Sequence, residues 1–102
     1  MSRVRVALDA MGGDDAPRTA VHGGVLAASP DLTVLLVGDR AAVAEQLAQH
    51  EDLPGAAYVE VAEASERVAS HEDGARAARA KPDSSVVVAC RQVKDGGADA
   101  AV

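Results

Sequence analysis

Short apolar runs alternate along the chain with segments of helical periodicity. Val4, Val6 and Leu8 alternate with charged or smaller residues, as in a half-buried strand, whereas Val43 and Leu47 have helical spacing. Gly and Pro punctuate the chain between these segments. The pattern predicts strands at residues 3–8, 33–37, 57–61 and 99–102, and helices at 17–28, 40–49, 74–80 and 84–94.

This alternation predicts the fold class. Strands that alternate with helices form βαβ units, so we expect an α/β fold: an open, mostly parallel sheet with helices on both faces. The pattern contains no internal repeat and no linker, and residues 1–102 are expected to lie within one domain. A strand at the end of the chain would lack ladder partners, which indicates a longer native unit.

Composition limits the core that the chain can build. Val, Ala and Leu dominate the apolar residues, Tyr58 is the only aromatic residue, and Phe and Trp are absent. A buried Ala contributes less free energy than the roughly 1.5–3 kcal/mol of a buried Val or Leu. We therefore expect stability to depend on neighbours outside these residues.

Charge and targeting signals narrow the function class. The formal net charge of -6 argues against non-specific nucleic-acid binding, which requires a basic surface.

Cys90 is the only cysteine, so no intrachain disulfide can form. We expect its side chain to be buried and to behave as a small apolar group, in a protein from a reducing compartment. There is no signal-peptide pattern and no run of about 20 apolar residues, which predicts a cytoplasmic protein.

The junction after the first predicted strand is the first candidate for chemistry. Gly12 and Gly13 follow this strand, and Pro17 lies where the next helix would begin. Glycines can adopt φ > 0 and leave backbone N–H groups uncovered, and a helix N-terminus behind them favours an anion. The alternative is an ordinary tight turn between strand and helix.

Two carboxylates flank these glycines. At an effective dielectric near 20, two like charges about 4 Å apart cost roughly 4 kcal/mol, so direct contact of both Asp9 and Asp14 with phosphate is disfavoured. Asp9 can instead hold the loop through backbone N–H groups, and Asp14 can cap the helix or orient Arg18. Neither residue has a second ligand residue at a spacing typical of metal sites, so we expect no metal.

A second anion-friendly arrangement precedes the helix predicted at 84–94. Lys81 supplies a positive charge, Ser84 and Ser85 supply hydroxyls, and Asp83 or Ser84 is a plausible N-cap. The alternative is a solvated lysine and an ordinary cap.

Other polar residues give weaker signals. The most basic local patch comprises Arg76, Arg79 and Lys81. It could receive an acidic partner, although a solvated face is the other explanation.

The histidines show no metal-binding or nucleophile pattern and are interpreted as surface or packing residues. They are His22, His50 and His71.

Five ordered motifs cover almost the whole chain: Leu8-Asp9-Ala10-Met11-Gly12-Gly13-Asp14 with Ala16-Pro17, Leu35-Leu36-Val37-Gly38-Asp39, Glu63-Ala64-Ser65-Glu66, Lys81-Pro82-Asp83-Ser84-Ser85 and Val93-Lys94-Asp95-Gly96-Gly97-Ala98-Asp99-Ala100. Together they resemble PlsX, the phosphate acyltransferase family of bacterial phospholipid synthesis. Glu63 stands where the family carries His and Val86 where it carries Met, and the stretch from His71 to Gly74 also differs from the common pattern.

The resemblance implies the function of a longer protein, of which this chain is an N-terminal piece. That protein would transfer a fatty acyl group from acyl carrier protein to orthophosphate, without a cofactor. The family implies an isocitrate/isopropylmalate dehydrogenase-like fold, a homodimer and peripheral membrane association. The implied substrate-binding residues are Asp9, Met11, Gly12, Gly13, Asp14, Lys81, Ser84 and Ser85.

Two other function classes compete with this interpretation. One is a non-catalytic phosphate- or nucleotide-binding module, although neither GxGxxG nor GxxxxGK[ST] occurs. The other is a structural fragment whose sheet is completed by another chain. Catalytic residues are not identified by the sequence.

Overall fold

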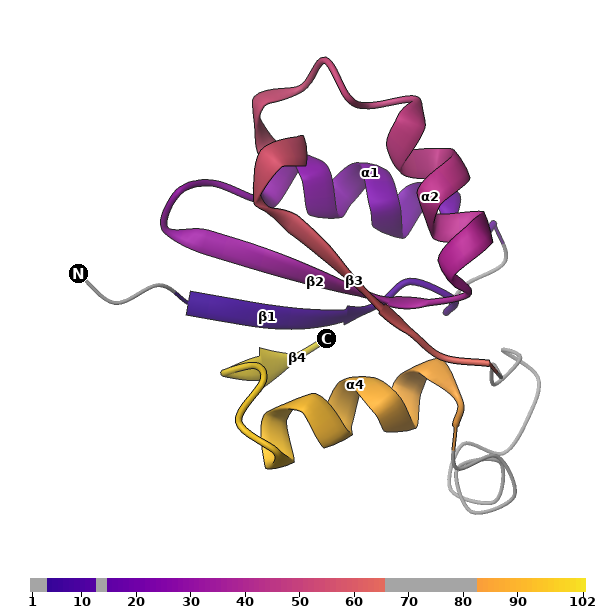
Figure 1. The fold of residues 1–102 in the computed structure, drawn as a ribbon, viewed down its shortest axis with the longest axis vertical. Coiled ribbons are helices and arrows are strands. Elements are labelled where there is room, and N and C mark those ends of the chain that lie inside the picture. Colours follow the sequence, from indigo (N-terminus) through magenta and orange to yellow (C-terminus); the bar gives the residue numbers. More distant parts are fainter. Residues whose placement is uncertain (1–3, 13–14, 66–82) are drawn as a thin grey trace.

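Strands and helices alternate along the chain, as the hydrophobic pattern predicts (Figure 1). The structure is a computed structural model that describes residues 4–12, 15–65 and 83–102. Its elements are β1 (Val4–Asp9), α1 (Arg18–Ala27), β2 (Leu32–Gly38), α2 (Arg40–Ala48), the 3₁₀ helix η1 (Pro54–Tyr58), β3 (Val59–Glu63), α4 (Ser85–Lys94) and β4 (Ala100–Ala101).

All strand pairs in the described part of the chain are parallel, and the strand order is β3-β2-β1-β4. β1 pairs with β2 along its whole length, from Val4 opposite Leu32 to Asp9 opposite Val37. β3 lies on the other side of β2, and β4 extends the sheet beyond β1. The predicted α/β class is therefore confirmed.

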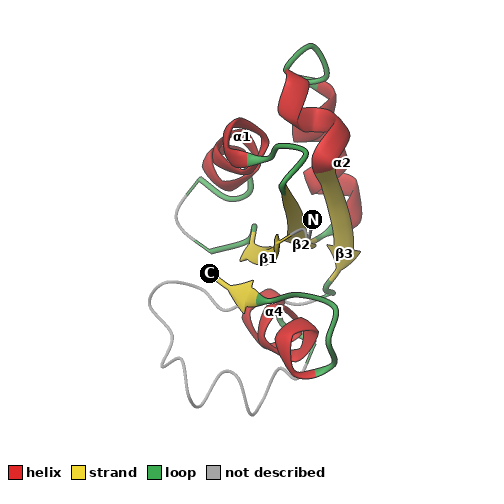
Figure 2. Cartoon of the chain, turned by 90° about the vertical axis from the view of Figure 1, so that its left-hand side faces the viewer, coloured by secondary structure: helices red, strands yellow, loops and turns green. Residues whose placement is uncertain are grey.

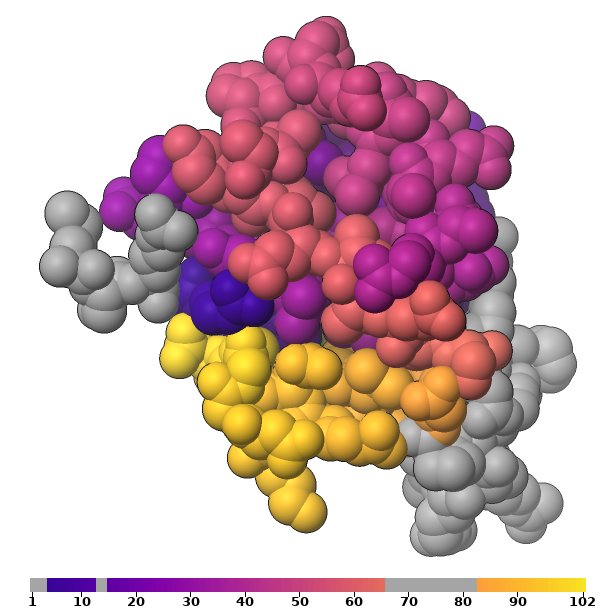
Figure 3. Space-filling view, viewed as in Figure 1, coloured from indigo at the N-terminus to yellow at the C-terminus, as the bar shows by residue number. Residues whose placement is uncertain are grey.

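Helices cover both faces of the sheet, because β2 sends alternate side chains to opposite sides (Figures 1 and 2). Val34 and Leu36 join the core beneath α1 and α2. Leu35 and Val37 join the core beneath α4. A continuous apolar run such as β2 is typical of a strand buried on both faces. The space-filling view shows α4 and β4 packed together at one end of the molecule (Figure 3).

The third strand begins later than the sequence pattern predicts. The prediction of a strand at 57–61 is wrong by two residues, because η1 occupies Pro54–Tyr58 and β3 runs over Val59–Glu63. Pro54 suits the first position of a helical turn. Gly55 packs so closely against the end of α1 that a Cβ there would lie 1.8 Å from the carbonyl oxygen of Val25.

The remaining boundaries within the described residues differ from the predictions by at most one residue, as the element ranges show. The strand predicted at 99–102 is assigned as β4 only over Ala100–Ala101, although Val102 still exchanges backbone hydrogen bonds with Ala7 and Asp9. The helix predicted at 74–80 lies outside the described residues.

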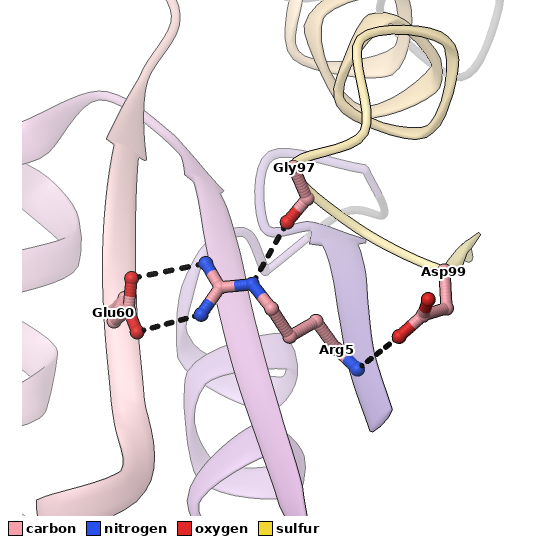
Figure 4. Close-up of polar contacts among 4 residues, drawn as sticks. All are labelled: Arg5, Glu60, Gly97 and Asp99. Carbon is pink, nitrogen blue, oxygen red and sulfur yellow. Dashed lines mark hydrogen bonds and ion pairs between the residues drawn. The ribbon is translucent and has the colours of Figure 1, made fainter. Parts of the chain in front are cut away.

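At the amino ends of the strands, Arg5 joins three parts of the chain (Figure 4). Its guanidinium makes two hydrogen bonds to Glu60 of β3, of 2.9 and 3.0 Å, and its Nε donates to the Gly97 carbonyl at 2.8 Å. Its backbone N–H donates to Asp99 at 2.8 Å. Hydrogen bonding from Arg5 lowers the pKa of Glu60. Both side chains are partly exposed, so we assign the ion pair a modest stabilising role.

Neighbouring glycines of α1 provide a direct test of helix-to-sheet packing. A Cβ at Gly23 would meet nothing within 4 Å, whereas one at Gly24 would lie 3.1 Å from Leu36 Cδ2 and 3.2 Å from Val34 Cγ1. Replacing either glycine by Ala raises helix propensity by the same amount. We expect Gly23→Ala to be more stable than Gly24→Ala by about 1–3 kcal/mol, measured by urea unfolding. Equal stabilities would contradict the close approach of α1 to β2.

Candidate functional site

Three connections gather at the carboxyl edge of the sheet. β1 ends at Asp9, β2 at Gly38 and β3 at Glu63, and parallel pairing places these ends together. Helices α1 and α2 begin after the loops that leave this edge. The start of α4 is tied to the same edge through Asp83 and Ser65, as described below. Helix N-termini carry unpaired N–H groups and partial positive charge, which favours anion binding here.

The loop after β1 is held by hydrogen bonds to the sheet and to its own first residue. Asp9 Oδ1 accepts from the Met11 N–H at 2.9 Å, and the Ala10 N–H donates to the Val37 carbonyl at 2.9 Å. Ala10 is fully buried. The predicted structural role of Asp9, which was to hold the loop through a backbone N–H group, is confirmed.

Gly12 is exposed at the tip of this loop. Its φ is not positive, since Gly96 is the only positive-φ glycine in the described ranges. Gly12 therefore does not use the freedom of glycine to adopt φ > 0. A Cβ at Gly12 would meet only the Asp9 carboxylate, at the ordinary contact distance of 3.4 Å. The fold tolerates a side chain here, so a requirement for glycine would come from a ligand. Gly13 and Asp14 lie outside the described residues.

Met11 covers the end of β2. A Cβ at Gly38 would lie 2.8 Å from Met11 Cγ and 2.9 Å from its Sδ. A larger residue at position 38 would therefore displace Met11 and shift the loop. Gly38 belongs to one of the family motifs, but no signal in the sequence indicates which side chain lies over it.

The first turn of α1 is organised by Asp15, which was not among the predicted site residues. Its carboxylate accepts from the Thr19 hydroxyl and from Arg18 Nη2, the latter at 3.4 Å. The Thr19 hydrogen bond is the main cause of a lowered pKa for Asp15, and Arg18 adds to it. Arg18 is thus oriented by Asp15; the predicted partner, Asp14, is outside the described part of the chain.

At the start of α2, polar contacts join the ends of β2 and β3. Asp39 caps the helix by accepting from the Ala41 N–H at 3.2 Å. Arg40 Nε donates to Glu63 Oε2 at 3.3 Å. Glu63, which stands where the resembled family carries His, therefore pairs with a cation at this edge. Both side chains of the pair are exposed.

The start of α4 is fixed by Asp83. Its Oδ2 accepts from the backbone N–H of Ser65 at 2.9 Å and from the Ser65 hydroxyl. This carboxylate therefore joins the end of β3 to the start of α4. The prediction that Asp83 or Ser84 caps the helix with its side chain is wrong: Ser84 occupies the N-cap position but makes no side-chain cap hydrogen bond. Asp83 is instead committed to a residue distant in sequence.

Ser84 and Ser85 are buried at this helix start, with exposed fractions of 0% and 1%. Ser84 Oγ has no hydrogen-bond partner among the residues that the structure describes. The predicted site residues thus form two groups at one edge of the sheet: Asp9, Met11 and Gly12 after β1, and the two serines at α4. Within the described ranges, no hydrogen bond joins these groups directly. Lys81 is outside those ranges.

The Asp83 contact makes stability depend on pH. Hydrogen bonds from Ser65, first from its hydroxyl and then from its N–H, lower the pKa of Asp83. The contribution is present above the unfolded pKa of about 3.9 and is lost as pH falls through the lower folded value. We expect the stability advantage of the wild type over Asp83→Asn to shrink between about pH 6 and pH 3, measured by urea unfolding. A constant difference would contradict this coupling.

Some remaining predictions concern residues away from this edge. Cys90 is exposed, so its predicted burial is wrong. The inner face of α4 is formed by Val88 and Ala89, and position 90 turns outward. His22 and His50 stack with ring centroids 4.5 Å apart, which confirms a surface and packing role. His71, Arg76 and Arg79 lie outside the described residues.

In residues 4–12, 15–65 and 83–102, no group of three or more His, Cys, Asp or Glu side chains is placed to hold a metal ion. No helix in these ranges has the length and apolar character needed to cross a bilayer.

Comparison with known proteins identifies the family. A family model described as "Fatty acid synthesis protein" matches residues 4–102. Phosphate acyltransferase of Desulfitobacterium hafniense (strain DSM 10664 / DCB-2) is 47% identical over 100 residues, which cover 97% of this chain and 29% of the relative. The corresponding enzyme of Streptococcus suis (strain 05ZYH33) is 40% identical over 98 residues, which cover 94% of this chain and 28% of the relative.

Phosphate acyltransferase of Heliobacterium modesticaldum is 44% identical over 100 residues, covering 97% of this chain and 30% of the relative. The chain therefore spans less than a third of the length of these curated relatives. The family match covers nearly every residue, including the segment that follows β1 and the start of α4 at the carboxyl edge. The chain belongs to the fatty acid synthesis protein family, the PlsX family that its motifs resemble.

Proposed function

We propose that a protein carrying this chain at the length of its relatives, called the complete protein below, transfers a fatty acyl group from acyl carrier protein to orthophosphate. One observation carries the proposal: relatives named phosphate acyltransferase are 40–47% identical over nearly the whole chain. The carrier protein and orthophosphate are its proposed partners, and a homodimer is its proposed assembly. Transferase activity in fatty acid and phospholipid synthesis is what the family supports.

The proposed reaction is a single displacement at a thioester. A phosphate oxygen attacks the thioester carbonyl and forms a tetrahedral oxyanion. Collapse of this intermediate breaks the carbon–sulfur bond and gives acyl phosphate and the carrier thiolate. A thiol with a pKa near 8.5 leaves with little need for a general acid. The protein must chiefly bind and orient an anion and stabilise developing negative oxygen.

The carboxyl edge suits these requirements. Gly12 is exposed and leaves the backbone uncovered after β1, and the N-termini of α1, α2 and α4 belong to the same edge. Asp9 accepts a hydrogen bond from Met11 within its own loop. This bond offsets part of the repulsion between its charge and a bound phosphate. We propose that the loop from Asp9 to Asp14 and the segment from Lys81 to Ser85 supply part of the phosphate and carbonyl environment.

Gly12→Val tests the loop's role. The fold has room for a Cβ at Gly12, so the variant is expected to fold. Its side chain would cover the loop N–H groups, and we expect phosphate-dependent acyl phosphate formation by the complete protein to fall about a hundredfold.

Gly23→Ala is the matched control, because it adds a side chain at an exposed glycine of α1. This control should retain activity. Full activity in a folded Gly12→Val protein would overturn the role of the loop. We also expect no turnover from the 102-residue chain alone, and normal activity from it in the same assay would refute that expectation.

A further inference from the structure

A cleft between α1 and α2 carries polar groups that the proposed reaction does not use. The two helices lie side by side on one face of the sheet (Figure 1). The cleft between them has a volume of about 520 Å³, which is within the range of small-molecule sites. Among the described residues, none that the family resemblance implies for substrate binding lines it. The cleft is therefore a separate candidate for a ligand.

Gln46 of α2 brings an unpaired acceptor to this cleft. The residue is half-buried, and its buried Oε1 has no hydrogen-bond partner among the residues that the structure describes. Leaving a buried amide oxygen unpaired costs free energy, and such atoms in folded proteins usually meet a donor. The last side-chain torsion of Gln is soft, so the amide can turn toward the cleft that it lines. A ligand there can supply the missing N–H or O–H group.

The charge of the lining favours an anion. Arg18 lies at one end of the cleft, His22 and His50 contribute imidazole rings, and Gln49 adds a second amide. No Asp or Glu of the described ranges lines it, although the chain has 16 Asp and Glu residues against 10 Lys and Arg. A guanidinium and N–H donors without a neighbouring carboxylate in the lining suit a ligand with anionic oxygens.

Asp15 contacts two of the lining residues but does not line the cleft itself. Its carboxylate accepts from the Thr19 hydroxyl and, at 3.4 Å, from Nη2 of Arg18. The Arg18 side chain is 71% exposed and makes no other hydrogen bond within the described part of the chain. Since a guanidinium has several N–H donors, Arg18 can bind an anion while it stays paired with Asp15.

His22 and His50 form one wall of the cleft. Their rings stack with centroids 4.5 Å apart and an interplanar angle of 3°. One ring belongs to α1 and the other follows the end of α2, so the stack joins the two sides of the cleft. A wall that is already arranged lowers the ordering cost of binding a ligand.

We propose that this cleft binds a small organic anion, either a phosphate ester or a carboxylate, that also carries a hydroxyl or amino group. Arg18 and the N–H groups of the two imidazoles bind the anionic oxygens. The hydroxyl or amino group of the ligand donates to Gln46 Oε1. This site goes beyond the proposed acyl transfer, because its lining is separate from the implied substrate-binding residues.

The first test is calorimetric titration of the complete protein with three probes. Adenosine 5′-monophosphate is a phosphate ester with hydroxyl and amino groups, citrate is a carboxylate with a hydroxyl, and adenosine is an uncharged counterpart. We expect a Kd below about 1 mM for at least one of the two anions and binding at least about tenfold weaker for adenosine. The anion that binds identifies the source of the charge. Binding of neither anion, or of adenosine as tightly as its monophosphate, would overturn the proposal.

The second test places the bound anion in the cleft. Gln46→Glu keeps the shape of the side chain but adds a carboxylate to the lining, and we expect it to raise the Kd of the bound anion about tenfold or more. Gln92→Glu in α4 is the matched control, because it makes the same change of charge outside this lining. His22→Phe keeps a flat ring for the stack but loses its N–H group, so it should weaken binding severalfold.

Gly12→Val distinguishes this cleft from the proposed phosphate site. A folded Gly12→Val protein should bind the anion as the wild type does, because Gly12 does not line the cleft. Equal affinities of Gln46→Glu and Gln92→Glu, or loss of the anion in Gly12→Val, would overturn the assignment. If the complete protein binds the anion in the cleft but forms no acyl phosphate, only the proposed function fails.

Discussion

Gly55→Ala is expected to destabilise the protein by about 3 kcal/mol or more, which is more than either Gly23→Ala or Gly24→Ala. The added Cβ would lie 1.8 Å from the Val25 carbonyl oxygen and 3.0 Å from that of Ala28. Both atoms belong to the backbone at the end of α1, so no side-chain rotation can relieve the overlap. η1 must move away from α1, which opens the core around Val25.

The measurement is urea unfolding of Gly55→Ala beside Gly23→Ala, the same chemical change at an open position of α1. Native domains are stable by only about 5–15 kcal/mol, so Gly55→Ala should lower the midpoint markedly or unfold the protein. Gly23→Ala should be as stable as the wild type or more stable. A Gly55→Ala protein of wild-type stability would show that η1 does not pack on α1 as described.

Leu36→Ala is expected to cost about 3–5 kcal/mol. Among the described residues, Leu36 is the largest fully buried side chain, and it lies in β2 beneath α1, near Gly24. The buried residues of this core other than Leu36 are all Val or Ala, which are too small to fill the space. The cavity should therefore remain largely open, which places the cost toward the upper part of the range.

Leu26→Ala is the matched control for this substitution, because it removes the same side chain from α1 at a position that is 65% exposed. Its cost should stay below about 0.5 kcal/mol, since exposed substitutions rarely exceed this value. Comparable losses from the two variants in urea unfolding would contradict the assignment of Leu36 to the central core.

Local patterns predicted the central strands well and the third strand poorly. β1 and β2 lie within one residue of their predicted bounds, because continuous or alternating apolar side chains mark them directly. The sequence before β3 contains Ala and Tyr, which fit a strand equally well. Their placement in η1 depends on the contact of Gly55 with α1, a tertiary contact that periodicity does not encode.

Among the polar residues, too, contacts between sequence neighbours were predicted and contacts between distant positions were not. The Asp9 hydrogen bond was predictable, because its partner Met11 is two positions away. Asp83 was assigned to the helix beside it, but Ser65, 18 positions away, takes its carboxylate. Arg5 was not selected, because its side-chain acceptors on Glu60 and Gly97 are separated from it by 55 and 92 positions. Long-range pairing of this kind becomes visible only in the folded chain.

The central claim is that the carboxyl edge of this sheet binds phosphate. A crystal of the complete protein soaked in inorganic phosphate tests it most directly. We predict electron density for phosphate at this edge, within hydrogen-bond distance of the Asp9–Gly12 loop or of Ser84 at the start of α4. Phosphate bound instead at the amino edge beside Arg5, or a carboxyl edge blocked by other parts of the protein, would contradict the account.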